Sequence, residues 1–580
     1  MQTPYLISYP YNSLVKRKRD IDIGDLYQNK IYLYQFNIYG SEEDIIRYIL
    51  DNIKNQNPNH YLNSAITKDN WNSYDPINII YSKKWPPNII LSPYDIVKEV
   101  FINPDIIIIG GGTTACALVH GLQNTDKRIL LLDAGKIIVD ENVTNINNFF
   151  TVWKDPYYTN IFGISTDLER TNFVSHVYNC GGCSIHNGAL CVIPSRSYLD
   201  QLGSNFTVEK VDQCYNDLFM KVNIRTSKPS QLGEIVSPII SEIFSVPNVD
   251  DYNLEVTSSS SSGQFFETPD GKRELLTKLL TQSKTVKVIN DFYVDKILFN
   301  GKNAIGIMGG NGEMIFASQI ILSAGVESSV ILERSGIGKR KVLEDLLIPV
   351  VYENSHVGEH VKNQLGPSLV IRTSNTELLK PADTNSLGTV SMAFLTSDNS
   401  ERKFQIFSSL HPFVEAPISK IYDFTNCFGI NICDLSPESE GYFHISSRKI
   451  FTQPHIKFNY YNDKIDILNG ISAYKKVYKI YQKLKELHPK DEFELVFPPE
   501  SIFNDDSNDT LIEKYLDAAT LLEEHYTSAC RIGDVVDENF DVIGVTGLKI
   551  ADASVLPKPP DGNPQATCMI IGYIVGTLLS

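Results

Sequence analysis

An apolar stretch that begins at residue 105 has the pattern of a strand, a turn and a helix. Residues 105–109 form an apolar run of the kind found in buried strands, and the glycine-rich turn 110–112 follows it. Residues 116–122 have a helical pattern, and residues 128–132 form a second strand-like run that ends at Asp133. This order predicts a βαβ unit with parallel strands.

The residues of the turn suit a dinucleotide. Gly110 permits a tight turn, Gly112 lets backbone amides approach a pyrophosphate, and the small Ala115 lets helix and strand pack closely. Thr113 and Thr114 lie at the start of the helix, where free amides favour an anion. The aspartate after the second strand stands where a carboxylate accepts hydrogen bonds from ribose hydroxyls. The pattern does not distinguish FAD from NAD.

Two other stretches have no regular pattern. Residues 257–263 are nearly all serine and predict an exposed loop or lid, because such a segment is too polar and flexible to pack. Residues 1–100 are rich in Asn, Tyr and Ile, and their Trp-Pro-Pro at 85–87 should end any regular element. We expect an extension packed ahead of the main domain. The basic run 16–19 is interpreted as solvated charge, with a nuclear address or an anion contact as alternatives.

Composition and charge narrow the class of protein. A chain of 580 residues with 42% apolar content can bury large cores and suggests two or more domains. The net charge of -17 and the pI near 5.2 disfavour direct binding to nucleic acid or anionic lipid, because counterion release needs a basic face. No uncharged apolar run approaches the length of about 18 residues that a membrane span needs, and residues 1–20 lack a signal-type apolar core. We expect a soluble, intracellular (cytoplasmic) protein without membrane contact.

Nine cysteines in so long a chain do not predict a disulfide framework. Cys180 and Cys183 form a CxxC pair, but no second pair or histidine pair stands at zinc-finger spacing, so no metal site is predicted. Cys183 and Cys530 are interpreted as packing cysteines, with redox-active thiols as the alternative.

Four further blocks occur in the order of a known family. Residues 181–188 read Gly-Gly-Cys-Ser-Ile-His-Asn-Gly, and residues 324–338 carry Ser329 where the family usually has proline. Residues 357–364 read Val-Gly-Glu-His-Val-Lys-Asn-Gln, and the fourth block extends over residues 525–567. Together with the glycine-rich turn, these blocks resemble the glucose-methanol-choline (GMC) oxidoreductases.

The resemblance covers the chain from about residue 105 to 580 and implies an architecture. The fold class is α/β (α+β overall), with a Rossmann-like FAD-binding domain built from discontinuous segments and a substrate-binding domain of antiparallel sheet and helices. The expected segments are 101–200, 281–365 and 520–580 for the FAD-binding domain, 201–280 and 366–519 for the substrate-binding domain, and 1–100 for the N-terminal extension.

The resemblance also implies a chemistry, the oxidation of an alcohol by hydride transfer to the flavin. His525 matches the family's catalytic histidine and is the candidate general base, a role that suits imidazole. Asn563 stands at the second catalytic position, where its amide would hold the substrate oxygen. The closing helix is expected to point its N-terminus at the flavin, because helix-end amides favour the negative charge of the reduced ring. A buried, hydrogen-bonded core histidine is the alternative for His525.

The expected cofactor is FAD, and its contacts follow from the motifs. The candidate FAD-binding residues are Gly110, Gly112, Thr113, Thr114, Ala115, Asp133, Gly182, Cys183, His186, Asn187, Gly188, Val294, Asp552, Ala553, Asn563, Pro564 and Gln565. Val294, on the strand-like run 286–298, matches a position whose backbone meets the adenine, with plain sheet core as the alternative. His186 resembles the choline-oxidase branch, whose histidine is bonded covalently to the flavin; a hydrogen bond near the ring is the alternative.

Partners and rival functions stay open at this point. The expected substrate is a small-molecule alcohol, the electron acceptor is oxygen or another molecule, and a homo-dimer or larger homo-oligomer is expected. One GMC branch cleaves cyanohydrins with an idle flavin, so a lyase is an alternative. The composition and the extension also resemble GMC-type proteins of giant viruses. A self-assembling virion or scaffold protein, which contacts nucleic acid only when assembled, is a further alternative.

Overall fold

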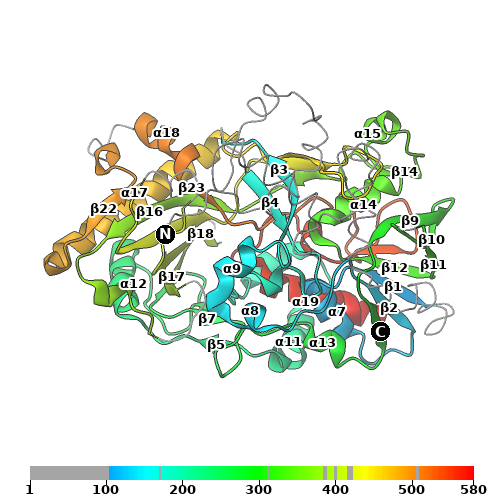
Figure 1. Cartoon of the computed structure of the whole chain (residues 1–580), viewed down its shortest axis with the longest axis horizontal. Coiled ribbons are helices and arrows are strands. Elements are labelled where there is room, and N and C mark those ends of the chain that lie inside the picture. The colour runs from blue at the N-terminus through cyan, green and yellow to red at the C-terminus, as the bar shows by residue number, and fades with distance from the viewer. Residues whose placement is uncertain are drawn as a thin grey trace, which may run out of the picture.

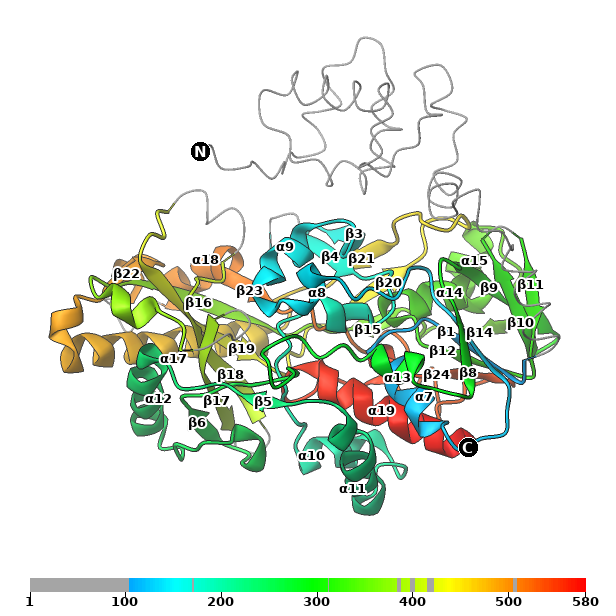
Figure 2. The same cartoon turned by 60° about the horizontal axis from the view of Figure 1, so that its bottom comes forward.

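The computed structural model describes residues 104–168, 172–310, 312–382, 388–396, 402–414, 422–503 and 509–580. The predicted extension and the basic run 16–19 lie outside the described residues. Figures 1 and 2 show an elongated molecule with a parallel sheet toward one end and an antiparallel sheet flanked by helices toward the other. The predicted α/β fold class is confirmed by this arrangement.

The parallel sheet carries the predicted βαβ unit. Its five strands lie in the order β24 (Leu548–Ile550), β12 (Gln319–Leu322), β1 (Ile106–Ile109), β2 (Ile129–Leu132) and β8 (Val286–Ile289). All four strand pairs are parallel. β1, β2 and β12 lie in the middle of the sheet and are almost entirely apolar and buried, as expected for parallel strands covered on both faces. Strands from distant parts of the chain therefore meet beside the glycine-rich turn.

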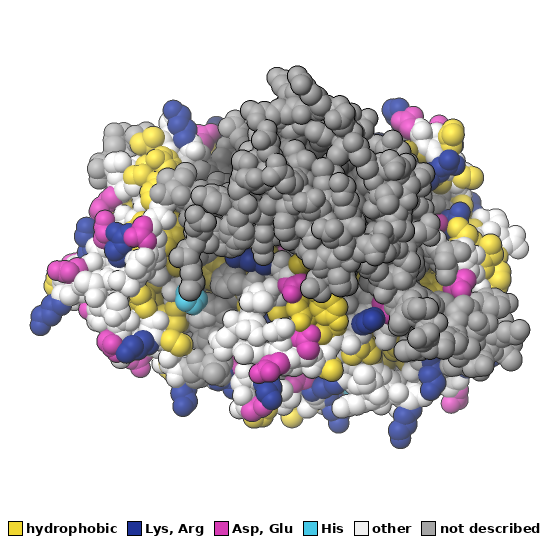
Figure 3. Space-filling view, viewed as in Figure 1, with side chains coloured by type: hydrophobic (Ala, Val, Ile, Leu, Met, Phe, Trp, Pro, Cys, Tyr) yellow, Lys and Arg dark blue, Asp and Glu magenta, His cyan; other side chains and the backbone are white. Residues whose placement is uncertain are grey.

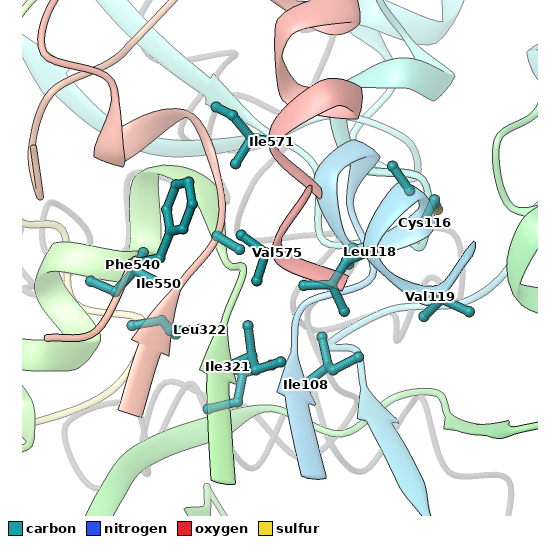
Figure 4. Packing of buried hydrophobic residues seen from close by; sticks show 14 of the residues in the cluster. Ile108, Cys116, Leu118, Val119, Ile321, Leu322, Phe540, Ile550, Ile571 and Val575 are labelled. Carbon is teal, nitrogen blue, oxygen red and sulfur yellow. The ribbon is translucent and has the colours of Figure 1, made fainter. Parts of the chain in front are cut away.

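Two helices cover this sheet and begin close together. α7 (Thr113–Gly121) follows β1, and α19 (Pro564–Leu579) closes the chain. Figure 4 shows side chains of both helices packed over strand residues such as Ile108 and Ile321. A Cβ on Gly572 of α19 would lie 2.1 Å from the carbonyl oxygen of Thr114 in α7, so glycine permits this close approach. The first turn of α7 is thus in direct contact with α19.

The second large sheet has antiparallel pairs. Its order is β22 (Glu494–Phe497), β16 (Leu365–Arg372), β19 (Cys427–Asp434), β18 (Arg402–Ser409), β17 (Thr389–Thr396) and β6 (Ser258–Ser260), and β23 (Thr520–Leu522) pairs with β16. α12 (Gln231–Phe244), α17 (Lys464–Leu487) and α18 (Asp509–Ala519) pack on one face around Ile406, Ile430 and neighbouring apolar residues. Side chains alternate along a strand, so Gln405 points to the other face, toward α19.

Smaller helices, strands and separate sheets complete the described chain. They are α8 (Glu141–Thr144), α9 (Phe149–Lys154), β3 (Asn160–Ser165), β4 (Asn172–His176), α10 (Arg196–Leu199), α11 (Val208–Asp217), β5 (Arg225–Thr226), β7 (Gln264–Phe265), α13 (Lys278–Thr281), β9 (Val294–Asn300), β10 (Asn303–Gly309), β11 (Met314–Phe316), α14 (Ser328–Arg334), β13 (Ile337–Gly338), α15 (Arg340–Asp345), β14 (Tyr352–Glu353), β15 (Glu359–Val361), β20 (Gly441–His444) and β21 (His455–Lys457). The strand-like run 286–298 is divided into β8 and β9 by a turn, in which Asp291 has a φ of 58°.

The serine-rich run 257–263 is not the exposed loop or lid that its composition predicts. Ser258, Ser259 and Ser260 are fully buried and form β6, which pairs with β17. Their small side chains let α12 approach, and the Ser259 hydroxyl lies 2.8 Å from that of Ser237 in α12. The prediction was wrong because small serine side chains fit beneath a helix and a hydroxyl such as that of Ser259 finds a partner there, although the Ser258 hydroxyl has none among the described residues.

Among the described helices, none is both long enough and apolar enough to cross a membrane. Figure 3 shows described Lys, Arg, Asp and Glu side chains interspersed around the rim of one face.

Candidate active site

The glycine-rich turn has the geometry that its sequence predicts. Gly110 has a φ of 92°, and a Cβ there would lie 2.4 Å from the carbonyl oxygen of Ser323. Gly112 is the N-cap of α7, and no described side chain caps this helix. The first amides of α7 are therefore available to an anion, and the helix dipole favours negative charge beside Thr113. Thr114 and Ala115 are buried against neighbouring elements.

Asp133 fixes the same turn through its carboxylate. Its Oδ2 accepts a hydrogen bond from the amide of Gly111 at 2.7 Å, and its Oδ1 accepts one from the amide of Gly135 at 2.8 Å. Each carboxylate oxygen has a further lone pair, so these bonds are compatible with a ribose contact. The amide of Phe292 donates to the Asp133 carbonyl at 2.8 Å. Buried Val294 follows Phe292 by two residues and is therefore held near Asp133.

The second glycine loop lies against the first. The amide of Gly181 donates to the carbonyl of Gly111 at 2.7 Å. Gly182 has a φ of 54°, and a Cβ there would lie 3.0 Å from the Cα of Gly112. Two stretches of backbone without side chains therefore line one space, as a flat or extended cofactor requires.

Cys183 is accessible at its side chain although many protein atoms surround it. Its side chain is exposed, yet burial raises the pKa of its thiol to about 12. Both observations hold when a side chain lies deep in the protein but borders a hollow. The interpretation as a packing cysteine is therefore wrong for Cys183, whereas Cys530 is completely buried. Burial also raises the pKa of Cys530, so neither thiol is ionised at neutral pH.

Asn187 joins this loop to the closing helix. Its Nδ2 donates to Oε1 of Gln565 in the first turn of α19 at 2.6 Å, and its Oδ1 accepts from Nη1 of Arg273 at 2.9 Å. Gly188 directly follows it. The hydroxyl of Thr567, also in the first turn of α19, is buried without a partner among the described residues. An unpartnered buried hydroxyl is uncommon in a protein interior, and here it lies close to a helix start that a ligand would occupy.

His186 is buried as a neutral imidazole. Its Nδ1 lies 2.9 Å from the Thr159 hydroxyl, which donates its single proton to the carbonyl of Val152 at 3.0 Å. The hydroxyl must therefore accept from Nδ1–H, which leaves Nε2 with its lone pair. Burial lowers the pKa of His186 to about 3. The ring is thus an uncharged nucleophile at neutral pH.

Asp552 and Ala553 join the C-terminal block to residues 324–338. The buried Asp552 carboxylate accepts from the amide of Gly325 at 3.0 Å and from the hydroxyl of Ser328 at 2.5 Å. Burial raises the pKa of Asp552. Ser329, which replaces the usual proline, is fully buried, and its hydroxyl has no partner among the described residues.

His525 is held by the last two residues of the 357–364 block. Its backbone amide donates to Oδ1 of Asn363 at 2.7 Å, and its Nδ1 lies 2.6 Å from Oε1 of Gln364. Nε2 of Gln364 donates to the carbonyls of Leu435 at 3.1 Å and Pro560 at 2.5 Å. The amide oxygen must then accept, so His525 carries its proton on Nδ1 and presents a lone pair at Nε2.

A general base is most effective with a pKa near neutrality, and the pKa of buried His525 lies well below that range. Burial lowers its pKa to about 3, because a charged imidazolium loses hydration there. The ring is therefore uncharged and ready to accept a proton throughout the neutral range. The site must stabilise the imidazolium that forms during a reaction.

Gln405, which lies in none of the sequence motifs, positions Asn563. Oδ1 of Asn563 accepts a hydrogen bond from Nε2 of Gln405 in β18 at 2.9 Å. This bond occupies the amide oxygen, so the Nδ2 group is the part of Asn563 that can donate to a ligand. Asn563 is also the N-cap of α19 but makes no cap bond with its side chain, and Pro564 follows in the first turn. Gln364 connects this region to His525, because Pro560 lies just before Asn563.

Glu523 is a second residue that sequence reasoning missed. Its amide donates to the carbonyl of Gln364 at 3.0 Å, continuing the pairing of β23 with β16, so the two side chains share one face. No described residue donates a hydrogen bond to its half-buried carboxyl. Burial, aided by the like charge of Glu524, raises the pKa of Glu523 to about 7. Glu523 stands two residues before His525 in the sequence, but no motif singled it out.

Taken together, the residues present fit FAD. Two uncapped helix starts, two glycine loops in contact, a buried carboxylate beside the turn and the unpartnered Thr567 hydroxyl border the same region. Amides at helix starts suit a pyrophosphate, and backbone without side chains suits close contact with a planar ring.

Two models of one family together match most of the described chain. The N-terminal model of the family described as GMC oxidoreductase matches residues 104–365, and its C-terminal model matches residues 437–572.

Individual relatives have several activities. An (R)-mandelonitrile lyase-like protein of Arabidopsis thaliana is 27% identical over 512 residues, covering 81% of this chain and 89% of that protein. Sinalpyl alcohol oxidase Nec3 of Nesocodon mauritianus is 25% identical over 511 residues, covering 81% and 88%. A solved formate oxidase variant of Aspergillus oryzae RIB40, studied for FAD modification, aligns with a TM-score of 0.70 at 17% identity and covers 82% of this chain and 98% of that chain.

Proposed function

The chain belongs to the GMC oxidoreductase family of FAD-dependent enzymes, and we propose that it oxidises an alcohol with His525 as the general base. Bound FAD supplies the hydride acceptor of the reaction. The observation that carries the proposal is the hydrogen-bond network that leaves the lone pair of His525 on Nε2.

His525 and Asn563 have separate roles toward the substrate hydroxyl. Nε2 of His525 accepts the hydroxyl proton, while the Nδ2 group of Asn563 donates a hydrogen bond to the same oxygen and stabilises its developing negative charge. Gln364 and Gln405 act through these two residues and hold them in orientation. Glu523, whose side chain shares a face with that of Gln364, would when ionised lower the energy of the imidazolium at His525.

The residues that would hold FAD follow the two glycine loops and the two helix starts. The amides after Gly112 would bind the pyrophosphate, Asp133 the ribose, and the backbone near Val294 the adenine. Residues 182–188 and the start of α19 would lie beside the flavin. Within this loop, Nε2 of His186 has the neutral, unprotonated form that a covalent bond to the flavin requires.

A reductive half-reaction tests the proposal. The FAD-loaded protein is mixed without oxygen with sugars, aryl alcohols, aliphatic alcohols and choline, and we expect at least one class to bleach the flavin band. His525→Ala should retain FAD but lose about 10²–10⁴-fold in the rate of bleaching, because it removes a general base. His455→Ala, an exposed histidine on β21, is the matched control. Unchanged bleaching by the His525 variant excludes this role.

The curated relatives favour a lyase as the second candidate function. The (R)-mandelonitrile lyase-like protein aligns with most of this chain. Cleavage of a cyanohydrin needs a base but no net oxidation, so His525 at Nε2 would suit both reactions. Consumption of mandelonitrile with an unchanged oxidised flavin spectrum would favour the lyase.

Assembly is a separate question. A homo-dimer or larger homo-oligomer stays a prediction, as does the self-assembling scaffold. Light scattering at several protein concentrations tests both: growth into large particles without turnover favours a scaffold, whereas small oligomers that react with an alcohol favour the enzyme.

A further inference from the structure

Two histidines and a carboxylate from separate segments converge outside the proposed catalytic groups. One ligand-type atom of each of His356, His360 and Asp534 lies within 4.8 Å of the other two. Nδ1 of His356 is 3.1 Å from Nε2 of His360. We propose that these three residues bind one divalent transition-metal ion.

The spacing of the nitrogens suits one ion. Two imidazole nitrogens bound at about 2.0–2.1 Å to a tetrahedral zinc ion lie roughly 3.3 Å apart. The observed 3.1 Å is close to that value, so both rings can turn their lone pairs to a common point with little movement. Asp534 is half-buried and completes the set by a change of its side-chain torsion, and water fills the remaining position.

A carboxylate behind His360 orients the ring. Nδ1 of His360 lies 2.5 Å from Oε2 of Glu440, so Nδ1–H donates there and the Nε2 lone pair points toward His356. Carboxylates in this position fix the tautomer of metal-binding histidines and raise their basicity. Lys362 and Arg531 hold Glu440 in turn, at 3.6 and 3.4 Å. His360 would therefore bind the ion directly, while Glu440 supports His360 from behind.

A hydrogen bond explains the histidine contact in the absence of metal. His356 can donate from Nδ1–H to Nε2 of His360, and a metal ion replaces that shared proton. On binding, His356 carries its proton on Nε2 instead, and no electrons move.

The donor set and the local charge restrict which metal ion can bind. Imidazole with one carboxylate suits Zn²⁺, Co²⁺, Ni²⁺ or Cu²⁺ better than Mg²⁺ or Ca²⁺. Asp534 is paired with Arg531, which shares the carboxylate and moderates the affinity. His356 and His360 stand at a spacing common among metal ligands, but Asp534 lies far away in sequence, so spacing alone did not reveal the complete set.

The ion would brace the segment that positions His525. The side chain of Asn354 donates to the carbonyl of Asp534 at 2.9 Å, and the amide of Gly358 donates to that of Ala529 at 2.8 Å. His360 is followed closely by Asn363 and Gln364, which hold His525. Metal binding therefore adds a clamp between two segments that already touch.

Zinc titration of the FAD-loaded protein tests the site. After treatment with a chelator, calorimetry should detect one Zn²⁺ per chain, and Zn²⁺ should raise the midpoint of thermal unfolding. We expect His356→Ala to weaken the binding at least tenfold, and His455→Ala to leave it unchanged. Asp534→Asn is the second variant and should weaken binding less than His356→Ala.

Absence of binding to the wild-type protein, or equal binding by His356→Ala, overturns the proposal and leaves a hydrogen bond between two histidines. The flavin spectrum of each variant, recorded with the titration, verifies the fold independently of catalysis. This result does not depend on alcohol oxidation.

Discussion

Nδ1 of His525 and Oε1 of Gln364 lie 2.6 Å apart, and this contact determines which nitrogen of the imidazole can act as a base. Gln364 uses its NH2 group on two backbone carbonyls, so its oxygen is left to accept from Nδ1–H. Nε2 of His525 is consequently unprotonated. A residue without acid or base chemistry of its own thus prepares the base.

Removal of the Gln364 amide should impair catalysis more than substrate binding. We expect Gln364→Leu to lower the rate of flavin reduction about 10–100-fold with little change in KM, because His525 loses the partner that sets its tautomer. The carbonyls of Leu435 and Pro560 also lose a donor, which lowers the free energy of unfolding by about 1–3 kcal/mol. Stopped-flow reduction and urea unfolding measure the two effects. Gln201→Leu, at the surface, is the control. A loss of stability with an unchanged rate would assign Gln364 a purely structural role.

The pH profile should reflect Glu523 rather than His525. With a pKa of about 3, His525 stays unprotonated between about pH 5 and 9 and contributes no acid limb there. Glu523, with a pKa of about 7, gains its negative charge as the pH rises through neutrality. Because that charge stabilises the imidazolium, the rate of flavin reduction should rise by up to about tenfold, which equals about 1.4 kcal/mol. Glu523→Gln should abolish the rise and Glu209→Gln, an exposed carboxyl, should keep it. A rise that persists in Glu523→Gln contradicts the assignment.

The same carboxyl should affect stability with a definite sign. Its pKa rises from 4.5 to about 7 on folding, so the folded protein binds more protons than the unfolded chain between these values. The free energy of unfolding therefore falls as pH increases from 4.5 to about 7, by at most about 3 kcal/mol. Urea unfolding of the wild type and Glu523→Gln across this range measures it. If the free energy of unfolding of the wild type rose with pH relative to that of Glu523→Gln, the raised pKa would be refuted.

A covalent flavin should reveal itself on acid precipitation. We expect the yellow colour to remain with the precipitated wild-type protein, because neutral His186 has Nε2 free to bond to the cofactor. His186→Ala should bind FAD but give a colourless pellet. Thr159→Val, which removes the partner of Nδ1, should lower the bound fraction. A yellow supernatant over a colourless wild-type pellet would leave only a hydrogen bond near the ring.

Gly182 should be indispensable for cofactor binding for a local reason. Gly182→Ala adds a Cβ 3.0 Å from the Cα of Gly112, where the two glycine loops meet. We expect FAD affinity to fall about tenfold or more, equivalent to about 1.4 kcal/mol. Gly301→Ala is a matched control, since its φ of 61° is similar to the 54° of Gly182 but nothing lies within 4 Å. Similar FAD affinities for the two variants would show that strain alone, and not the contact, matters.

Periodicity and motif order determined the nucleotide-binding half of this protein. Four isoleucines before the glycine-rich turn are typical of a buried strand in a covered sheet, and Gly110 and Gly182 have positive φ values that other residues adopt with difficulty. His525 and Asn563 were identified by the motifs around them. Composition misled at residues 257–263, because serine is polar in isolation but buries readily when α12 supplies partners.

Only the tertiary structure decided how these residues are tuned. Gln364 ends a recognised sequence block, but its role, like those of Gln405 and Glu523, depends on partners brought near by strand pairing and by the start of α19. His356 and His360 stand four positions apart in the sequence, whereas Asp534 joins them only in the folded chain. A sequence pattern reports which side of an element is buried, whereas a pKa or a tautomer depends on desolvation and on hydrogen bonds from distant segments. Those interactions exist only once the chain has folded.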